Sequence, residues 1–114
     1  MAGKYTFVAD QGSKFDRILT WTNAAGTAYD LTGWTAKMEI RTAAGGTLLQ
    51  TLQTSDSTIV LGGVAGTIRL VVGSAVTVLW TWASGVYDLE LTDTTTEKTR
   101  LIQGNFVISP EVTQ

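Results

Sequence analysis

The sequence predicts an all-β protein, an antiparallel β-sandwich of about eight strands that forms one domain over residues 1–114. Its 114 residues include 20 threonines, 12 glycines and one proline, a composition typical of short strands separated by tight turns. Apolar and polar residues alternate in several short segments, and turn-forming residues recur at intervals of roughly 8–12 residues. Immunoglobulin-like and jelly-roll strand orders both fit this spacing.

The first two predicted strands cover residues 4–9 and 15–22. Side chains alternate between the two faces of a strand, so Tyr5 and Phe7 share one face of the first strand. In the second strand, Arg17 interrupts the row of apolar side chains. A bulge near Arg17 would move it out of that row.

Further strands are expected where the alternation resumes after each turn. Gly104 is expected to mark a bulge or bend in the last of them. Pro110 has no backbone N–H, so strand pairing should stop there and residues 110–114 should form a free tail. These further strands are residues 35–41, 48–52, 58–61, 67–72, 86–92 and 98–109.

One segment breaks the strand pattern. Ser74 can cap the start of a helix. Ala75, Val76, Leu79 and Trp80 then follow at helical spacing. We therefore expect a short helical turn near residues 75–80, with these apolar side chains closing one end of the sandwich. The β-branched residues of the segment favour a strand as the competing structure.

Most catalytic and metal-binding devices lack their central residue in this chain, which has no histidine and no cysteine. A Ser-His-Asp triad and a zinc or copper site are therefore excluded. Asp88 and Glu90 share a strand face, but that face is the solvent side of an amphipathic strand. Other aspartates lie in or beside turns, where their side chains bond nearby backbone groups. We therefore predict a protein that is not an enzyme and has no catalytic residue, metal ligand or cofactor.

The charge distribution speaks against several classes of partner. The chain carries 8 basic and 10 acidic residues, and the basic ones are scattered singly, so no nucleic-acid partner is expected. No apolar run approaches the roughly 18 residues that span a bilayer, so no membrane partner is expected. The first residues lack the apolar core of a secretory signal, which predicts synthesis and folding in the cytoplasm.

The tryptophans allow two readings. Buried between two sheets, they would supply much of the core; exposed, they would form a platform for stacking on sugars, as in a carbohydrate-binding module. In the helical turn expected here, Trp80 and Trp82 flank one threonine and would not point the same way, so one of them is a candidate surface anchor for a partner. The four tryptophans are Trp21, Trp34, Trp80 and Trp82.

Several stretches of the sequence resemble a known group of proteins. They are residues 29–41, which contain the segment Asp30-Leu-Thr-Gly-Trp-Thr35, and residues 85–92, 100–104 and 107–113. They resemble small all-β proteins encoded among the structural genes of tailed bacteriophages. They are also similar to the N-terminal β-sandwich of phage upper baseplate proteins, in which a D-L-T-G-x-T segment precedes a strand. The resemblance consists of turn and strand patterns, from about residue 15 to residue 113.

The resemblance implies a non-enzymatic virion structural protein, made in the host cytoplasm. It would act by protein–protein association in a tail, baseplate or fibre-attachment module, with a capsid decoration (head) protein as the alternative. The expected partners are other phage structural proteins and copies of the chain itself in a symmetric assembly. Residues 1–9 and 110–114 are the segments expected to pack on neighbouring subunits. The candidate interface residues are Tyr5, Phe7, Trp80, Trp82, Pro110 and Val112.

Overall fold

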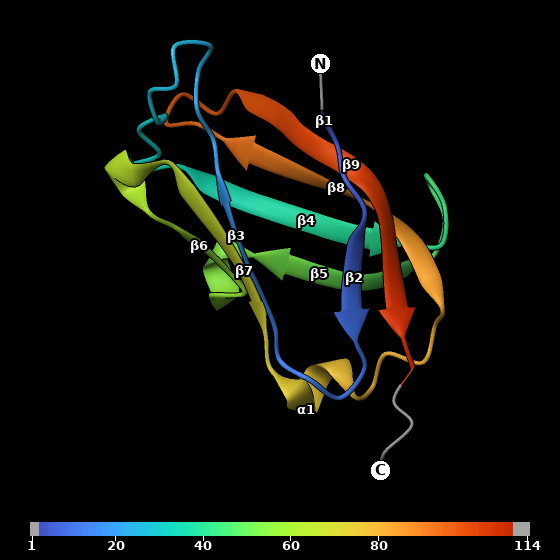
Figure 1. Ribbon diagram of the computed structural model, residues 1–114. Helices are drawn as coiled ribbons and strands as arrows, with labels where there is room; N and C mark the ends of the chain where they lie inside the picture. Colours follow the sequence, from blue (N-terminus) through green and yellow to red (C-terminus); the bar gives the residue numbers. More distant parts are fainter. Residues whose placement is uncertain (1–2, 111–114) are drawn as a thin grey trace.

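The structure, a computed structural model, describes residues 3–110 as two β-sheets packed face to face (Figure 1). The strands are β1 (Gly3–Lys4), β2 (Phe7–Asp10), β3 (Phe15–Thr20), β4 (Thr35–Arg41), β5 (Leu48–Gln53), β6 (Ile59–Leu61), β7 (Thr67–Val72), β8 (Ser84–Thr92) and β9 (Lys98–Ser109). The helical segments are α1 (Ser74–Thr77) and the 3₁₀ turns η1 (Thr54–Asp56) and η2 (Gly63–Ala65). The larger sheet has the order β1–β9–β8–β4–β5, with β2 also paired to β9, and the smaller sheet has the order β3–β7–β6.

The predicted β-sandwich is confirmed, and its strand order is immunoglobulin-like rather than that of a jelly roll. In immunoglobulin domains one sheet contains strands B, E and D, and the other contains G, F and C, followed by C′ in the variable type. When the strands are lettered along the chain from β3, the smaller sheet follows the first order and β9–β8–β4–β5 follow the second.

The N-terminal strand pairs with the last strand of its own chain. β1 and β2 both run parallel to β9 in one shared register, with Gly3 opposite Ile102 and Phe7 opposite Phe106. We expected residues 1–9 to pack on a neighbouring subunit, but the described part of this segment lies on β9. It therefore completes the larger sheet of its own domain.

The structure places the irregularities of the strands differently from the prediction. Gly104 lies opposite Tyr87 in regular pairing, and a side chain there would strike the carbonyl oxygen of Tyr5. Glycine is therefore needed for close approach of the N-terminal strand, not for a bulge. The register of β9 shifts beside Leu101 instead. The bulge expected near Arg17 is absent, because β3 pairs with β7 regularly along its whole length.

The inward-facing rows of the two sheets form one apolar core. Met38 and Ile40 on β4 and Leu89 and Leu91 on β8 are fully buried, as the alternation predicted. No helix within residues 3–110 is long and apolar enough to span a bilayer. The other fully buried large side chains are Phe7, Phe15, Leu31, Leu52, Ile59, Ile68, Leu70 and Phe106.

Candidate docking surface

The segment around α1 closes one end of the sandwich, beside the ends of β2 and β9 (Figure 1). Gln11, which follows β2, connects these parts. Its backbone N–H donates to the carbonyl of Ser109 at 2.9 Å, and its side-chain amide donates to the carbonyl of Trp80 at 3.1 Å. Pro110 follows Ser109 and is exposed at the same end. The end of the last strand and the α1 segment are therefore held together.

Two buried side chains fix the α1 segment to the sandwich. Thr77 is fully buried, and its hydroxyl donates to the carbonyl of Ser13 at 2.8 Å. Trp80 is 3% exposed; its indole N–H donates to the side-chain oxygen of Gln50 at 3.1 Å, and its ring lies 5.5 Å from that of Phe106. Both polar groups are thus satisfied, so the segment can be buried without a desolvation penalty for an unpaired donor.

The same segment exposes three apolar side chains around its turn. We call Val76, Val78 and Leu79 the α1 surface; all three are exposed, and Leu79 is 72% exposed. Residues 70–87 contain no charged side chain. Exposed apolar groups on a rigid, uncharged support are typical of protein–protein contact sites. The α1 surface is therefore the candidate docking surface.

The helical turn was predicted correctly, but its orientation was wrong. The spacing placed Val76 and Leu79 on the inward face with Trp80, whereas the structure buries Thr77 and Trp80 and exposes the other two. Because α1 has only four residues, its packing is decided by single contacts rather than by periodicity. The hydrogen bond from Thr77 to Ser13 makes the polar residue the better one to bury. No local pattern in the sequence reveals that partner.

The six predicted interface residues fall into different environments. Phe7 and Trp80 belong to the core of the domain, so their side chains do not lie at the surface where we expected them. Trp82 is partly buried beside Trp80, with ring centroids 5.6 Å apart. Pro110 is exposed at the α1 end, as described above, and Val112 lies outside the described residues.

Tyr5 is the remaining predicted interface residue, and it lies away from α1. Its side chain is exposed, and its ring contacts that of Phe7 at 4.8 Å. Its carbonyl accepts a 2.7 Å hydrogen bond from the Tyr87 hydroxyl. Burial raises the pKa of Tyr87 well above its usual range, so the hydroxyl stays a donor at neutral pH. The structure thus brings Trp80, Trp82 and Pro110 to one end but leaves Tyr5 on another face.

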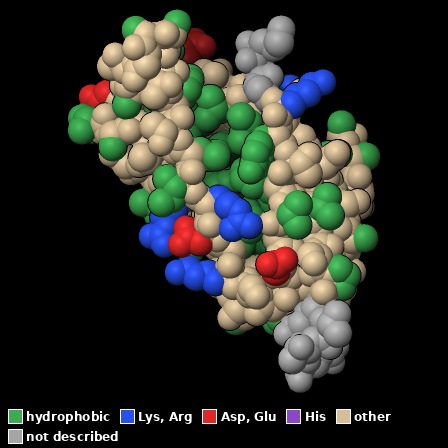
Figure 2. Space-filling model, viewed as in Figure 1, with side chains coloured by type: hydrophobic (Ala, Val, Ile, Leu, Met, Phe, Trp, Pro, Cys, Tyr) green, Lys and Arg blue, Asp and Glu red, His purple; other side chains and the backbone are tan. Residues whose placement is uncertain are grey.

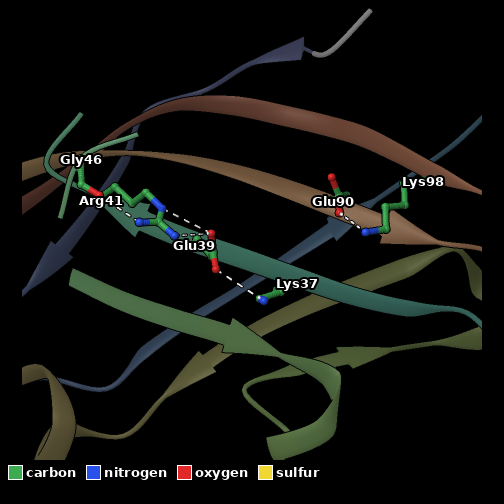
Figure 3. A network of polar contacts seen from close by, with 6 residues as sticks. All are labelled: Lys37, Glu39, Arg41, Gly46, Glu90 and Lys98. Carbon is green, nitrogen blue, oxygen red and sulfur yellow. Dashed lines mark hydrogen bonds and ion pairs between the residues drawn. The ribbon is translucent and has the colours of Figure 1, made fainter. Parts of the chain in front are cut away.

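The outer face of the larger sheet is charged rather than apolar. On β4, Glu39 lies between Lys37 at 3.4 Å and Arg41 at 3.0 Å, and Arg41 also donates to the carbonyl of Gly46 at 2.9 Å (Figure 3). The hydrogen bond from Arg41 holds the pKa of the Glu39 carboxyl below its usual range. Lys37 of this β4 network is exposed to solvent, whereas Glu39 and Arg41 are about one-third exposed.

Asp88 and Glu90 lie on this outer face, as predicted. Asp88 is 3.4 Å from Arg100, and Glu90 is 3.8 Å from Lys98. Each carboxylate is therefore paired with a cation of β9, an arrangement typical of cross-strand surface pairs rather than of an acid–base pair.

A shallow groove of about 660 Å³ runs over the same outer face. Its walls come from the β4–β5 loop, the start of the N-terminal strand, and β8 and β9. The polar lining includes Lys4, Arg41, Asp88, Arg100 and Gln103. Cations and carboxylates both line the groove, so it presents no single sign of charge to a ligand.

The other end of the sandwich carries an aromatic cluster. Trp21 stacks on Tyr29 with ring centroids 4.1 Å apart, and Trp34 meets Trp21 edge-on at 5.8 Å. All four tryptophans lie within the described residues, and each is buried or partly buried. No tryptophan in the described part of the chain is therefore fully exposed, as the stacking platform of a carbohydrate-binding module would require.

Three aspartates stabilise turns in the same way. Asp30, Asp56 and Asp93 each accept hydrogen bonds from the backbone N–H and the hydroxyl of the threonine two residues later. The threonine hydroxyl lowers the pKa of each carboxyl. The turn role predicted for these aspartates is confirmed. Within residues 3–110, acidic side chains form no group of three or more that could hold a metal ion.

The chain matches no protein-family model and no curated protein sequence. Among solved structures it is similar to the extracellular domain of the voltage-gated sodium channel beta4 subunit, a parallel homodimer with a role in cell–cell adhesion. That match has 13% identity over 98% of this chain and 96% of that chain, with a TM-score of 0.46. Extracellular domains 3–5 of Drosophila OTK match with 14% identity over 90% of this chain and 32% of that chain, with a TM-score of 0.38. At these identities the similarity concerns the fold alone.

Proposed function

We propose that the chain is a non-catalytic association module, a structural protein of a tailed-phage virion that docks on other virion proteins. The observation that carries the docking role is the α1 surface, a set of exposed apolar side chains on an uncharged segment that is fixed to the core. The mechanism is association alone, with no bond made or broken.

The energetics of the α1 surface support docking. Burying one exposed leucine or valine side chain contributes on the order of 1.5–3 kcal/mol. Leu79 is the most exposed of the three residues and can supply the largest part of that area. Since Thr77 and Trp80 fix the segment, little conformational freedom is lost when a partner covers it.

The virion assignment is supported by the resemblance of residues 15–113 to phage structural proteins. This resemblance favours a position in the tail, the baseplate or a fibre attachment. A capsid decoration protein is the second candidate, because it would use the same docking physics. Copy number separates the two positions: hundreds of copies per particle would assign the protein to the head. Other virion proteins and further copies of the chain are the proposed partners.

The docking test compares Leu79→Lys with Val64→Lys. Val64 lies in η2, at the opposite end of β7, and is 73% exposed, so the two changes add the same charge at equally exposed apolar positions. In particles produced from a phage genome that encodes each variant, we expect the Leu79→Lys protein to be lost from purified particles and the Val64→Lys protein to be retained. Thermal unfolding of both purified variants checks that they fold.

The outcomes separate the two parts of the proposal. Retention of Leu79→Lys at the wild-type level, or equal loss of both variants, would contradict docking through the α1 surface. Absence of the wild-type chain from purified particles would overturn the virion assignment itself.

A further inference from the structure

The strand β3 forms one edge of the smaller sheet. It pairs with β7 on one side, and no other strand within residues 3–110 pairs with its second side. The pairing with β7 runs in regular antiparallel register from Phe15 opposite Val72 to Thr20 opposite Thr67. A regular, unpaired strand edge is a template for another strand, because its backbone groups already have the required spacing.

The direction of the backbone groups follows from hydrogen bonds at both ends of β7. The N–H of Trp21, just after β3, donates to the carbonyl of Gly66, just before β7, at 2.9 Å. The N–H of Val71 donates the other way, to Thr58 beside β6, at 2.9 Å. Because the direction alternates along a strand, the odd-numbered residues of β3 bond to β7. The N–H and C=O groups of its even-numbered residues therefore point to the free edge.

Arg17 covers only part of this edge. Its guanidinium donates at 3.0 Å to the carbonyl of Asp16 on β3 and at 3.0 Å to the carbonyl of Val8 on β2. An inward-pointing charge on an edge strand is a known protection against unwanted pairing, and here it acts at the first half of β3. Both hydrogen bonds of the guanidinium go to residues other than Ile18 and Thr20, and the Ile18 side chain is 64% exposed.

The surface beside the second half of this free edge is partly apolar. Figure 2 shows hydrophobic side chains gathered in a hollow of the molecule, on the side where β3 and the β1–β9 edge of the larger sheet diverge. On the outer face, Ile18 lies opposite Arg69 of β7, which in turn lies opposite Val60 of β6. The second half of β3 thus combines open backbone groups with exposed apolar side chains.

We propose that β3 pairs antiparallel with β3 of a second copy, about a two-fold axis at Ile18. This register joins the open edge groups of Ile18 to those of Ile18 in the other copy and sets Asp16 opposite Thr20 on both sides. It yields a continuous sheet of six strands, β6–β7–β3 followed by the same strands in reverse. The contact is isologous and closed, so it gives a dimer and not a fibre.

Charge selects this register over its neighbours. A two-fold axis at Asp16 would set two carboxylates directly opposite each other, and an axis at Arg17 would do the same with two guanidinium groups. An axis at Leu19 would set Asp16 opposite a residue beyond the end of β3 in the other copy, and the pairing would be shorter. The axis at Ile18 avoids like charges and spans the edge from Asp16 to Thr20. At its ends the Asp16 carbonyl, which can accept two hydrogen bonds, accepts from Thr20 of the other copy beside its bond from Arg17.

This contact deepens the proposed association function by naming one self-contact, and it does not use the α1 surface. Its test is therefore separate from that of docking: Leu79→Lys should dimerise as the wild type does. Loss of dimerisation in the Ile18 variants alone would support the β3 contact. Loss of particle incorporation in Leu79→Lys alone would support docking through the α1 surface.

Sedimentation velocity of the purified full chain, from micromolar to millimolar concentration, should show a species of twice the 12.2 kDa mass. The variant Ile18→Pro removes an outward N–H together with the exposed isoleucine side chain, and it should leave the pairing with β7 intact because no bond to β7 uses that N–H. Ile18→Lys adds a charge at the two-fold axis and serves if the proline variant does not fold. Each variant should weaken dimerisation at least about tenfold, which corresponds to a loss of about 1.4 kcal/mol of binding free energy.

The matched control is Val60→Lys, which adds the same charge to an exposed valine on the same face of the same sheet, away from the β3 edge. It should leave dimerisation unchanged. Amide exchange at millimolar concentration should slow at Ile18 and Thr20 relative to dilute protein. A wild type that stays monomeric, equal effects of Ile18→Lys and Val60→Lys, or concentration-independent exchange at both amides would each overturn the proposal.

Discussion

The α1 end and the outer face of the larger sheet present two kinds of surface. Around α1, apolar side chains are exposed on an uncharged segment that two buried hydrogen-bonded residues, Thr77 and Trp80, hold in place. On the sheet face, partly exposed charges such as Glu39 and Arg41 neutralise one another. The difference teaches that the folded state depends on the inner side of α1, while the charged face contributes mainly solubility.

The largest effect expected from this comparison is that of Trp80→Ala. The change removes a buried indole from between Phe106 and Gln50 and leaves a cavity, which costs about 3–5 kcal/mol of the free energy of unfolding. Urea unfolding monitored by circular dichroism measures it, with Trp82→Ala as the partly buried control. A loss for Trp80→Ala as small as for surface variants would break the comparison.

A smaller effect is expected from Thr77→Val, which keeps the shape of the side chain and removes the hydroxyl. The carbonyl of Ser13 then loses its donor, at a cost of about 1–3 kcal/mol. The exposed Thr81 offers the matched change Thr81→Val, which should leave the urea midpoint almost unchanged. Equal midpoints for the two variants would show that the hydrogen bond does not hold α1.

The smallest effect is expected from Glu39→Gln on the charged face, within about 1 kcal/mol at neutral pH. The folded pKa of Glu39 lies below its unfolded value, so its contribution to stability is present above the unfolded pKa and is lost as the pH falls through the folded pKa. The difference between wild type and Glu39→Gln should therefore shrink as the pH falls. A difference that grows in acid would contradict the pairing with Arg41.

The sequence predicted elements whose evidence is local. Strict alternation over residues 35–41 gave β4 its observed bounds, Thr35–Arg41, because one face is buried and the other solvated. The sandwich itself followed from many such segments. The strand order did not, because pairing of β1 and β2 with β9 joins residues about a hundred positions apart, and no local pattern records it.

The candidate docking surface lies beside Trp80 and Trp82, two of the residues predicted as an interface, and that prediction stays a prediction. Two of its exposed residues, Val76 and Leu79, were expected inside, and Thr77 takes the buried position instead. In β3, Arg17 falls on the same face as the inward-pointing apolar side chains, and from the sequence we interpreted this as a bulge. It is a signal of an edge strand, since a guanidinium on the inner row is tolerated only where the sandwich opens to solvent.

The parallel pairing of the first and last strands has a mechanical consequence. Since β1 and β2 run in the same direction as β9, the start of the described chain and its end at Pro110 lie toward opposite ends of a 44 Å long body (Figure 1). Tension between these ends loads the β2–β9 hydrogen bonds in shear, all at once, rather than peeling them open one by one. A domain pulled between these two ends therefore resists extension along its long axis. Single-molecule stretching should show a higher rupture force along this axis than across β4 and β5.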